Sequence, residues 1–275
     1  MQIWEAALLG LVQGLTEFLP VSSSAHLRIL GQVLPSGSDP GAAFTAIVQI
    51  GTELAVLVHF RRDLIAMLRA VLAQLLRRPG YDGASARLGW IVAIGSLPIV
   101  VLGLALQGAI ETVLRDLYLT AAMLIGFGLV LALADRIGSK ALTLDRLGWR
   151  SGIALGFAQA LALIPGVSRS GATITGALFL GFGRPAAARF SFLLAVPAVF
   201  GSGLYQLAKS WGDPPRAALA PTVVATLTAF LTGYFVIVGF MRLISRISFL
   251  PFVCYRVALG LLLLALLWVG VLSPG

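Results

Sequence analysis

Residues 13–26 read QGLTEFLPVSSSAH, and residues 159–173 read QALALIPGVSRSGAT. Each stretch places proline, several hydroxyl groups and an ionisable side chain in the middle of hydrophobic sequence. Pro20 and Pro165 lack a backbone donor, and the serines that follow favour turns and helix caps, so each stretch predicts a break between two short helical arms. Polar groups in an apolar environment are costly and usually functional. These two stretches therefore decide both the fold and the candidate site.

The composition predicts an all-α polytopic membrane protein. The chain of 275 residues is 59% hydrophobic and 11% charged, with a mean hydropathy of +0.96. A soluble domain does not fit, so we expect a single integral membrane domain over residues 1–275. Six apolar runs are each long enough to cross a hydrocarbon core of about 30 Å, and they lie at about 41–60, 88–108, 118–134, 187–208, 219–241 and 250–272.

The two quoted stretches are expected to form re-entrant helical hairpins. Residues 24–34 would rise only about 16 Å as a helix, which is too short to span, so the hairpin tip should lie inside the membrane. At an offset of 146 residues, seven of the sixteen positions from 9 to 24 are identical. The chain therefore reads as two repeat halves, about 1–135 and 147–275. Each half has one hairpin and three crossings. Because the number of crossings is odd, the second half is inverted in the membrane relative to the first.

The charge pattern predicts the orientation. A net charge of +9 would suggest nucleic-acid binding in a soluble chain, but here the basic residues lie in short connections, as the positive-inside rule requires. Six Arg fall in 61–87 and three Arg with one Lys in 135–150, so both connections are assigned to the cytoplasm. Both termini are then extracytoplasmic, and the first hairpin and its site face that side. Cys254 is the single cysteine, which argues against a disulfide or thiolate metal site.

Spacing within the first hairpin predicts which side chains act together. Residues three or four positions apart share a helix face. Gln13 and Glu17 form such a pair on the entering arm, and Ser23 and His26 form one on the returning arm, where a hydroxyl and an imidazole suggest a nucleophile and its base. Two polar residues on the next crossing are candidates for lining the cavity or for pairing with an arginine: Gln49 and Glu53.

The second hairpin predicts an anion site. Arg169 and Thr173 share a face, and Ser168 and Ser170 flank the arginine at a helix N-terminus, a place suited to phosphate. The two tips together hold an acid, a base, hydroxyls and a guanidinium, which suits phosphoryl transfer. Two plainer alternatives stay open, in which the serines only cap helices and Glu17 pairs structurally with Arg169.

A membrane transporter or lipid flippase is the main rival to an enzyme. Inverted repeats with broken helices that meet near the midplane are typical of transporters too. The set of Glu17, Ser23 and His26 favours an enzyme, because it holds more acid and base capacity than anion binding needs. A non-catalytic scaffold would leave the intramembrane charges unexplained.

The two stretches resemble the two signature motifs of the bacterial undecaprenyl-diphosphate phosphatase family, also called the bacitracin-resistance protein family. Both motifs occur in order, at suitable spacing, in a chain of the family's size. The resemblance implies a hydrolase of the bacterial cytoplasmic membrane that removes the terminal phosphate of undecaprenyl diphosphate. The product, undecaprenyl phosphate, is the recycled lipid carrier of cell-wall synthesis, and overproduction confers bacitracin resistance. A polyprenyl diphosphate and membrane lipids are the implied partners, and the choice between monomer and homodimer stays open.

The resemblance also implies residue roles and a divalent cation, Mg²⁺ or Ca²⁺. Glu17 is the expected main ligand, because Gln13 fills the other position of the acidic motif with an amide, a weaker ligand for a hard cation. His26 is expected to activate either Ser23 or a water molecule. The implied catalytic residues are Glu17, Ser23, His26 and Arg169. The implied phosphate-binding residues are Ser168, Arg169, Ser170 and Thr173.

Overall fold

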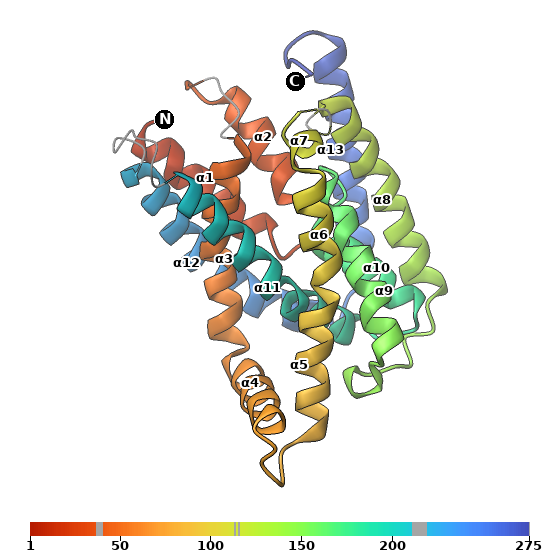
Figure 1. Ribbon diagram of the computed structural model, residues 1–275. Coiled ribbons are helices and arrows are strands. Elements are labelled where there is room, and N and C mark those ends of the chain that lie inside the picture. The colour runs from red at the N-terminus through yellow and green to blue at the C-terminus, as the bar shows by residue number, and fades with distance from the viewer. Residues whose placement is uncertain (37–40, 113, 115, 211–218, 275) are drawn as a thin grey trace.

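The structure is a computed structural model that describes residues 1–36, 41–112, 114, 116–210 and 219–274. Within these ranges the chain is helical, without a β-strand (Figure 1). The α-helices are α1 (Ile3–Thr16), α2 (Ser23–Val33), α3 (Gly41–His59), α4 (Arg61–Leu75), α5 (Gly83–Gly95), α6 (Leu97–Ala105), α7 (Gln107–Glu111), α8 (Leu117–Ile137), α9 (Trp149–Ala160), α10 (Arg169–Phe179), α11 (Arg184–Ser210), α12 (Leu219–Leu243) and α13 (Leu250–Trp268). Two short 3₁₀ turns, η2 (Leu144–Arg146) and η3 (Leu161–Leu163), flank α9.

The crossings confirm an all-α multi-pass membrane protein. Among the described residues, five continuous spans are long and apolar enough to cross, namely α5 with α6, α8, α11, α12 and α13, and α3 with α4 makes a sixth that is sharply bent. All six coincide with the predicted crossings. The second of them begins at Gly83 rather than near 88, because the Asp82 side chain caps α5 by accepting a hydrogen bond of 3.0 Å from the Ala84 amide.

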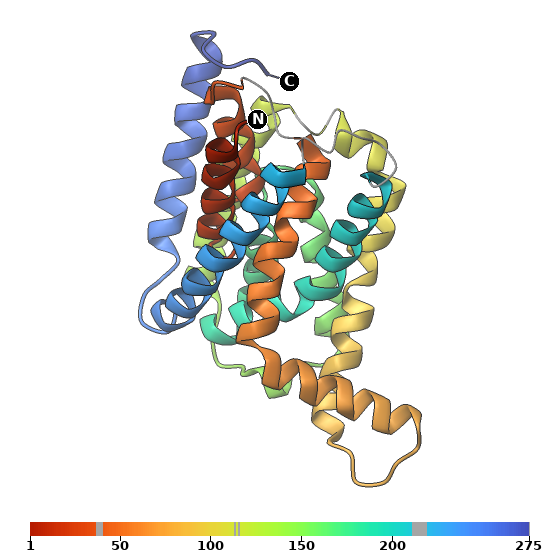
Figure 2. The ribbon, with the colours of Figure 1, turned by 90° about the vertical axis from the view of Figure 1, so that its left-hand side faces the viewer.

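The bend between α3 and α4 is 80°, and α4 turns away from the bundle with α5 beside it (Figure 2). Arg189 on α11 holds α4 at its first turn through an ion pair of 2.7 Å with Asp63. Helix α4 is amphipathic, with Leu68, Leu72 and Leu75 among its exposed apolar side chains.

Each hairpin is closed at its outer end. The Glu5 side chain, at the start of α1, accepts a hydrogen bond of 2.9 Å from the amide of Ser36, just after α2. In the second hairpin, Leu142 lies before α9 and is joined to the segment after α10. Its amide donates a hydrogen bond to the Gly181 carbonyl oxygen, and its carbonyl oxygen accepts one from the Gly183 amide, each at 2.9 Å. The first hairpin opens toward the end that carries both termini, and the second opens toward the opposite end (Figure 1). The two hairpins are therefore inverted relative to each other.

Glycines at equivalent repeat positions let the halves pack in the same way. Helix α1 packs on α12, and α9 packs on α5 and α6. A Cβ on Gly10 would lie 2.2 Å from the Ala225 carbonyl oxygen of α12, and one on Gly156 would lie 2.2 Å from the Gly95 carbonyl oxygen of α5. Gly10 and Gly156 are 146 positions apart, so the repeat conserves a close helix approach that only glycine permits.

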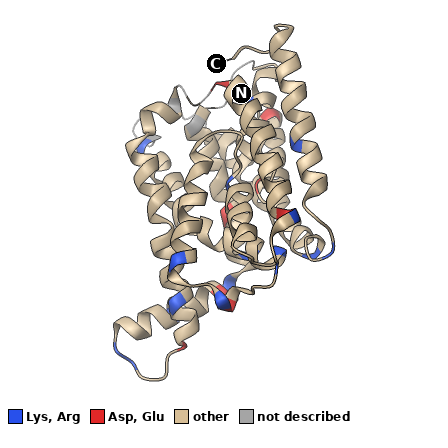
Figure 3. Cartoon of the chain, turned by 90° about the vertical axis from the view of Figure 1, so that its right-hand side faces the viewer, with Lys and Arg blue, Asp and Glu red and all other residues tan. Residues whose placement is uncertain are grey.

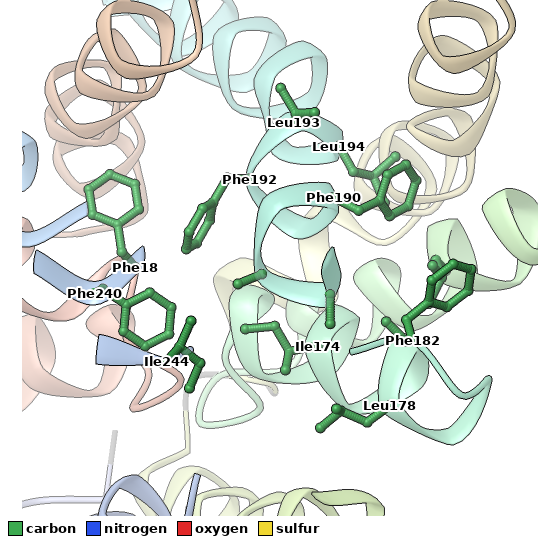
Figure 4. Packing of buried hydrophobic residues seen from close by; sticks show 14 of the residues in the cluster. Phe18, Ile174, Leu178, Phe182, Phe190, Phe192, Leu193, Leu194, Phe240 and Ile244 are labelled. Carbon is green, nitrogen blue, oxygen red and sulfur yellow. The ribbon is translucent and has the colours of Figure 1, made fainter. Parts of the chain in front are cut away.

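An aromatic cluster anchors the first tip. Phe18 follows Glu17 directly and is 1% exposed. Its ring meets Phe192 of α11 edge-to-face at 5.4 Å between centroids, and Phe192 meets Phe240 of α12 at 6.0 Å (Figure 4). Such pairs prefer this geometry and contribute beyond area burial. The packing of Phe18 thereby holds the neighbouring Glu17 at a defined depth within the helix bundle.

Charged residues are sparse through the middle of the molecule and gather at one end. Figure 3 shows Lys and Arg gathered toward the end of the molecule away from the termini, the end that carries the connections from α4 to α5 and from α8 to α9. A few charged positions remain deep inside, and these belong to the hairpin tips and the helices around them.

Candidate active site

The two hairpin tips are the non-helical segments 17–22 and 164–168. Helix α1 ends at Thr16 with Glu17 as its C-cap, and α2 begins after Ser22. In the second hairpin, η3 is followed by Gly166 and by Ser168, which caps α10 by accepting a hydrogen bond of 3.2 Å from the Gly171 amide. The second hairpin contacts the first tip directly, because Ser170 in the first turn of α10 donates a hydrogen bond of 3.1 Å to the Leu19 carbonyl oxygen.

Both tips contain a serine in the left-handed backbone region. Ser22 has φ 71° and Ser168 has φ 72°, and Gly166 has φ 93°. A non-glycine residue with positive φ costs on the order of 1–3 kcal/mol and persists only where the surroundings hold it. Each strained serine directly precedes a helix whose first residue is a predicted site residue, Ser23 in one tip and Arg169 in the other.

Glu17 lies at the centre of the site. Its Oε2 accepts hydrogen bonds from the Ser23 hydroxyl at 2.5 Å and from Gln13 Nε2 at 2.7 Å. Its Oε1 forms an ion pair with Arg169 Nη2, which joins the first tip to the second. The carboxylate is therefore bound to a hydroxyl, an amide and a guanidinium while only 6% of Glu17 is exposed. A buried carboxylate needs such partners.

Glu53 of α3 is a second carboxylate at the same place. It is fully buried, and its Oε2 lies 3.6 Å from Arg169 Nη2, an ion-pair distance too long for a hydrogen bond. Neither of its oxygen atoms has a hydrogen-bond partner among the described residues. Glu53 lines a small cavity with Glu17, Arg169 and Ser170. Gln49, one turn earlier, is not among the residues around that cavity.

The predicted pair of Ser23 and His26 is not formed. The Ser23 hydroxyl donates to Glu17 instead, six positions earlier across the break. His26 Nδ1 lies 2.8 Å from the Ser22 carbonyl oxygen, and Nε2 lies 2.6 Å from the hydroxyl of Tyr255 on α13. Because a carbonyl only accepts, the neutral imidazole carries its proton on Nδ1, and Nε2 accepts from the tyrosine. The pairing fails because the turn at Ser22 directs the two side chains to different partners.

The hydroxyls of the second tip and of the start of α10 have hydrogen-bond partners within the protein. Thr173 donates to the Arg169 carbonyl oxygen at 3.1 Å, and Ser168 and Ser170 lie 3.2 Å apart, oxygen to oxygen. Arg169 differs, because its Nη1 has no hydrogen-bond partner among the described residues. The arginine thus keeps donor capacity for an anion while its Nη2 pairs with Glu17.

The family model described as bacitracin resistance protein BacA matches residues 6–262. The chain belongs to the BacA family. Among its relatives, undecaprenyl-diphosphatase 2 of Agrobacterium fabrum is 63% identical over 271 residues, 98% of either chain. Undecaprenyl-diphosphatase of an Arthrobacter species, strain FB24, is 58% identical over 98% of this chain and 96% of the relative. The enzyme of the same name from Micrococcus luteus is 56% identical over 98% of both.

Two further residues of this BacA-family chain were not among the sequence candidates, Tyr255 and Arg256. Both lie on α13, and Arg256 is fully buried with all its hydrogen bonds directed at backbone carbonyl oxygens. The sequence did carry a signal for Arg256, because it is the only charged residue in the apolar run 250–272. That is the same signal that singled out Glu17 and Arg169. The sequence carried no such signal for Tyr255, because its contact with His26 arises only when the chain is folded.

Proposed function

We propose that this chain is an undecaprenyl-diphosphate phosphatase. The observation that carries the proposal is the meeting of Glu17, Ser23 and Arg169 between the two hairpins. It places a hydroxyl nucleophile, its base and a guanidinium whose Nη1 has no partner among the described residues at one point inside a membrane protein. The substrate is inferred from the relatives, which are named undecaprenyl-diphosphatase and are 51–63% identical over nearly the whole chain. Helices near the site expose apolar side chains, such as Leu54 of α3, and such a surface suits a polyprenyl tail.

The proposed site faces the extracytoplasmic side, with both termini there. The positive-inside rule supports this orientation, since the Arg-rich connections 61–87 and 135–150 lie at the end of the molecule opposite the termini (Figure 3). The first hairpin, which carries Glu17 and Ser23, opens toward the end with the termini. Substrate would then be the diphosphate exposed on the outer leaflet.

In the proposed mechanism Ser23 is the nucleophile and Glu17 its base. The Ser23 oxygen attacks the terminal phosphorus, its proton passes to Glu17 Oε2, and the bond to the bridging oxygen breaks. Undecaprenyl phosphate leaves, and water then hydrolyses the phosphoserine to release phosphate. Arg169 would bind the terminal phosphate through Nη1, because that nitrogen has no hydrogen-bond partner in the part of the chain that the structure describes. A direct attack by water, with Ser23 only orienting it, is the alternative.

The residues around Glu17 fit a divalent cation. Glu53 has two unsatisfied carboxylate oxygens, and Gln13 Oε1 is also without a hydrogen-bond partner among the described residues. Oxygen donors of this kind suit Mg²⁺ or Ca²⁺. We infer that Glu17, Glu53 and the Gln13 amide oxygen would hold such an ion, with the carboxylates as the stronger ligands. When bound, the ion would neutralise charge on the diphosphate.

Phosphate release from undecaprenyl diphosphate by the purified chain in detergent tests the proposal. We expect release in the presence of Mg²⁺ by the wild type and none by Arg169→Ala. Arg146→Ala is the matched control, since Arg146 lies exposed in η2 beside Asp145, between α8 and α9, and should keep activity. Absence of release by the wild type, or wild-type release by the folded Arg169→Ala variant, would contradict the proposal.

Transport of a polyprenyl phosphate is the second candidate. The equivalent packing of α1 on α12 and of α9 on α5, in inverted hairpins, favours it. A detergent micelle has no two sides, so transport alone yields no free phosphate there. Lipid movement across a vesicle membrane without phosphate release would favour this candidate over the first.

A further inference from the structure

Arg256 has every donor of its guanidinium in use. The group has five N–H bonds, and the structure gives it five acceptors, one for each. Two of them are consecutive carbonyl oxygens of α8, with Nε 3.1 Å from Leu124 and Nη2 3.2 Å from Met123. All five acceptors are backbone carbonyl oxygens, so the positive charge is solvated by the main chain rather than by a carboxylate.

The other three acceptors belong to the two hairpin tips. Nη1 lies 3.1 Å from the Pro20 carbonyl oxygen of the first tip and 3.0 Å from the Val167 carbonyl oxygen of the second. Nη2 lies 2.8 Å from the Gly166 carbonyl oxygen. One side chain therefore joins α13, α8 and both tips, which are 146 positions apart in the repeat.

These carbonyls lie beside the strained turns. Pro20 is two residues before Ser22, and Gly166 and Val167 directly precede Ser168. Serines with a left-handed backbone conformation need support from their surroundings. In both tips Arg256 donates hydrogen bonds to carbonyl oxygens of the residues that precede these serines. Ser23 and Arg169 follow immediately, so the place of the proposed nucleophile and of the phosphate-binding arginine depends on these turns.

Glycines make room for the guanidinium. A Cβ on Gly171 of α10 would lie 2.9 Å from Arg256 Nη1, and one on Gly128 of α8 would lie 3.5 Å from Nε. A larger residue at Gly171 would push the arginine off the tips. Glycine at these two positions thus leaves room for the long side chain of Arg256.

We propose that Arg256 is a positioning residue for the phosphatase reaction. Its guanidinium ties the two tips to each other and so sets the distance between Ser23 with Glu17 on one side and Arg169 on the other. This inference rests on the proposed function. A lysine would keep the charge but has only three donors, so it would leave at least two of the five carbonyls unbound.

Hydrogen exchange and steady-state kinetics on the wild type, Arg256→Met and Arg256→Lys test this role. In detergent without substrate, we expect the amides of Val21 and Val167, which are hydrogen bonded within the tips, to exchange faster in Arg256→Met. The kcat should fall about 100-fold with little change in KM, as expected when reacting groups are misplaced. Arg256→Lys should show smaller changes of both kinds.

Arg184→Met is the matched control, because Arg184 is bound to Asp135 at the far end of α8, away from the tips. It should leave tip exchange and kcat near the wild type. The inference would be overturned if the tip amides of Arg256→Met exchanged at the wild-type rate, or if exchange became faster evenly over all helices. Full activity of Arg256→Lys would also overturn it.

If Arg256→Met does not fold, the lysine variant decides alone. A wild type that releases no phosphate would refute the proposed function, while the exchange rates would still decide whether Arg256 holds the tips.

Discussion

The Ser23 hydroxyl donates a hydrogen bond of 2.5 Å to Glu17 Oε2. This contact couples a nucleophile to a carboxylate that is also paired with Arg169 of the other hairpin. A carboxylate in this place both orients the serine oxygen and can accept its proton. The symmetric hairpins thus build one site with divided roles, because the repeat equivalents of Glu17 and Ser23 are Leu163 and Arg169.

Ser23→Ala should lower kcat by about 1,000-fold or more if the serine forms a covalent intermediate, since the remaining site only positions substrate. Rapid quench after mixing with substrate labelled in the terminal phosphate should trap a labelled protein in the wild type and not in Ser23→Ala. Ser24→Ala is the control, because Ser24 bonds only to Ser22 among the described contacts. An unlabelled wild type, with turnover intact, would favour direct attack by water.

Glu53→Gln should weaken divalent-cation binding by about 10-fold, equivalent to about 1.4 kcal/mol. The reason is that Glu53 offers two carboxylate oxygens without a hydrogen-bond partner among the described residues. Calorimetric titration with Ca²⁺ in detergent measures this without turnover. Glu5→Gln is the control, because Glu5 is also a buried carboxylate but lies at the outer end of α1, remote from the tips. This variant should bind Ca²⁺ as the wild type does. Equal affinity of the two variants would remove Glu53 from the cation site.

The hairpins and their charged residues were predictable because their signals are local. A proline followed by serines breaks a helix wherever it occurs, and Glu17 and Arg169 stand out in apolar sequence. The bond from Ser23 to Glu17 was not predictable, because it spans a non-helical break where helical spacing gives no rule. The partner of His26 is 229 positions away, so no periodicity could indicate Tyr255.

Tyr255→Phe should lower kcat by roughly 10-fold while leaving the fold intact, if His26 takes part in proton transfer. The phenyl ring keeps the stack on His26, whose centroid distance is 5.6 Å, but loses the hydroxyl that bonds to Nε2. The chain has two histidines, so ¹⁵N spectra with His59 replaced should show the Nδ1–H form of His26 in the wild type. Tyr205→Phe, a similarly exposed tyrosine of α11, is the control. Unchanged kcat in Tyr255→Phe would limit His26 to a structural role.

Gly10→Ala and Gly156→Ala should each destabilise the chain by about 1–3 kcal/mol, because an added methyl would overlap a backbone carbonyl at 2.2 Å in both halves. Gly126→Ala of α8 has open space around it and should be neutral or stabilising by up to about 1 kcal/mol through helix propensity. The opposite signs separate packing from propensity. Thermal unfolding in detergent measures all three. The losses at Gly10 and Gly156 should add in the double variant, since the two glycines contact different helices. A neutral result at either position would mean that the two halves do not depend on the same close approach.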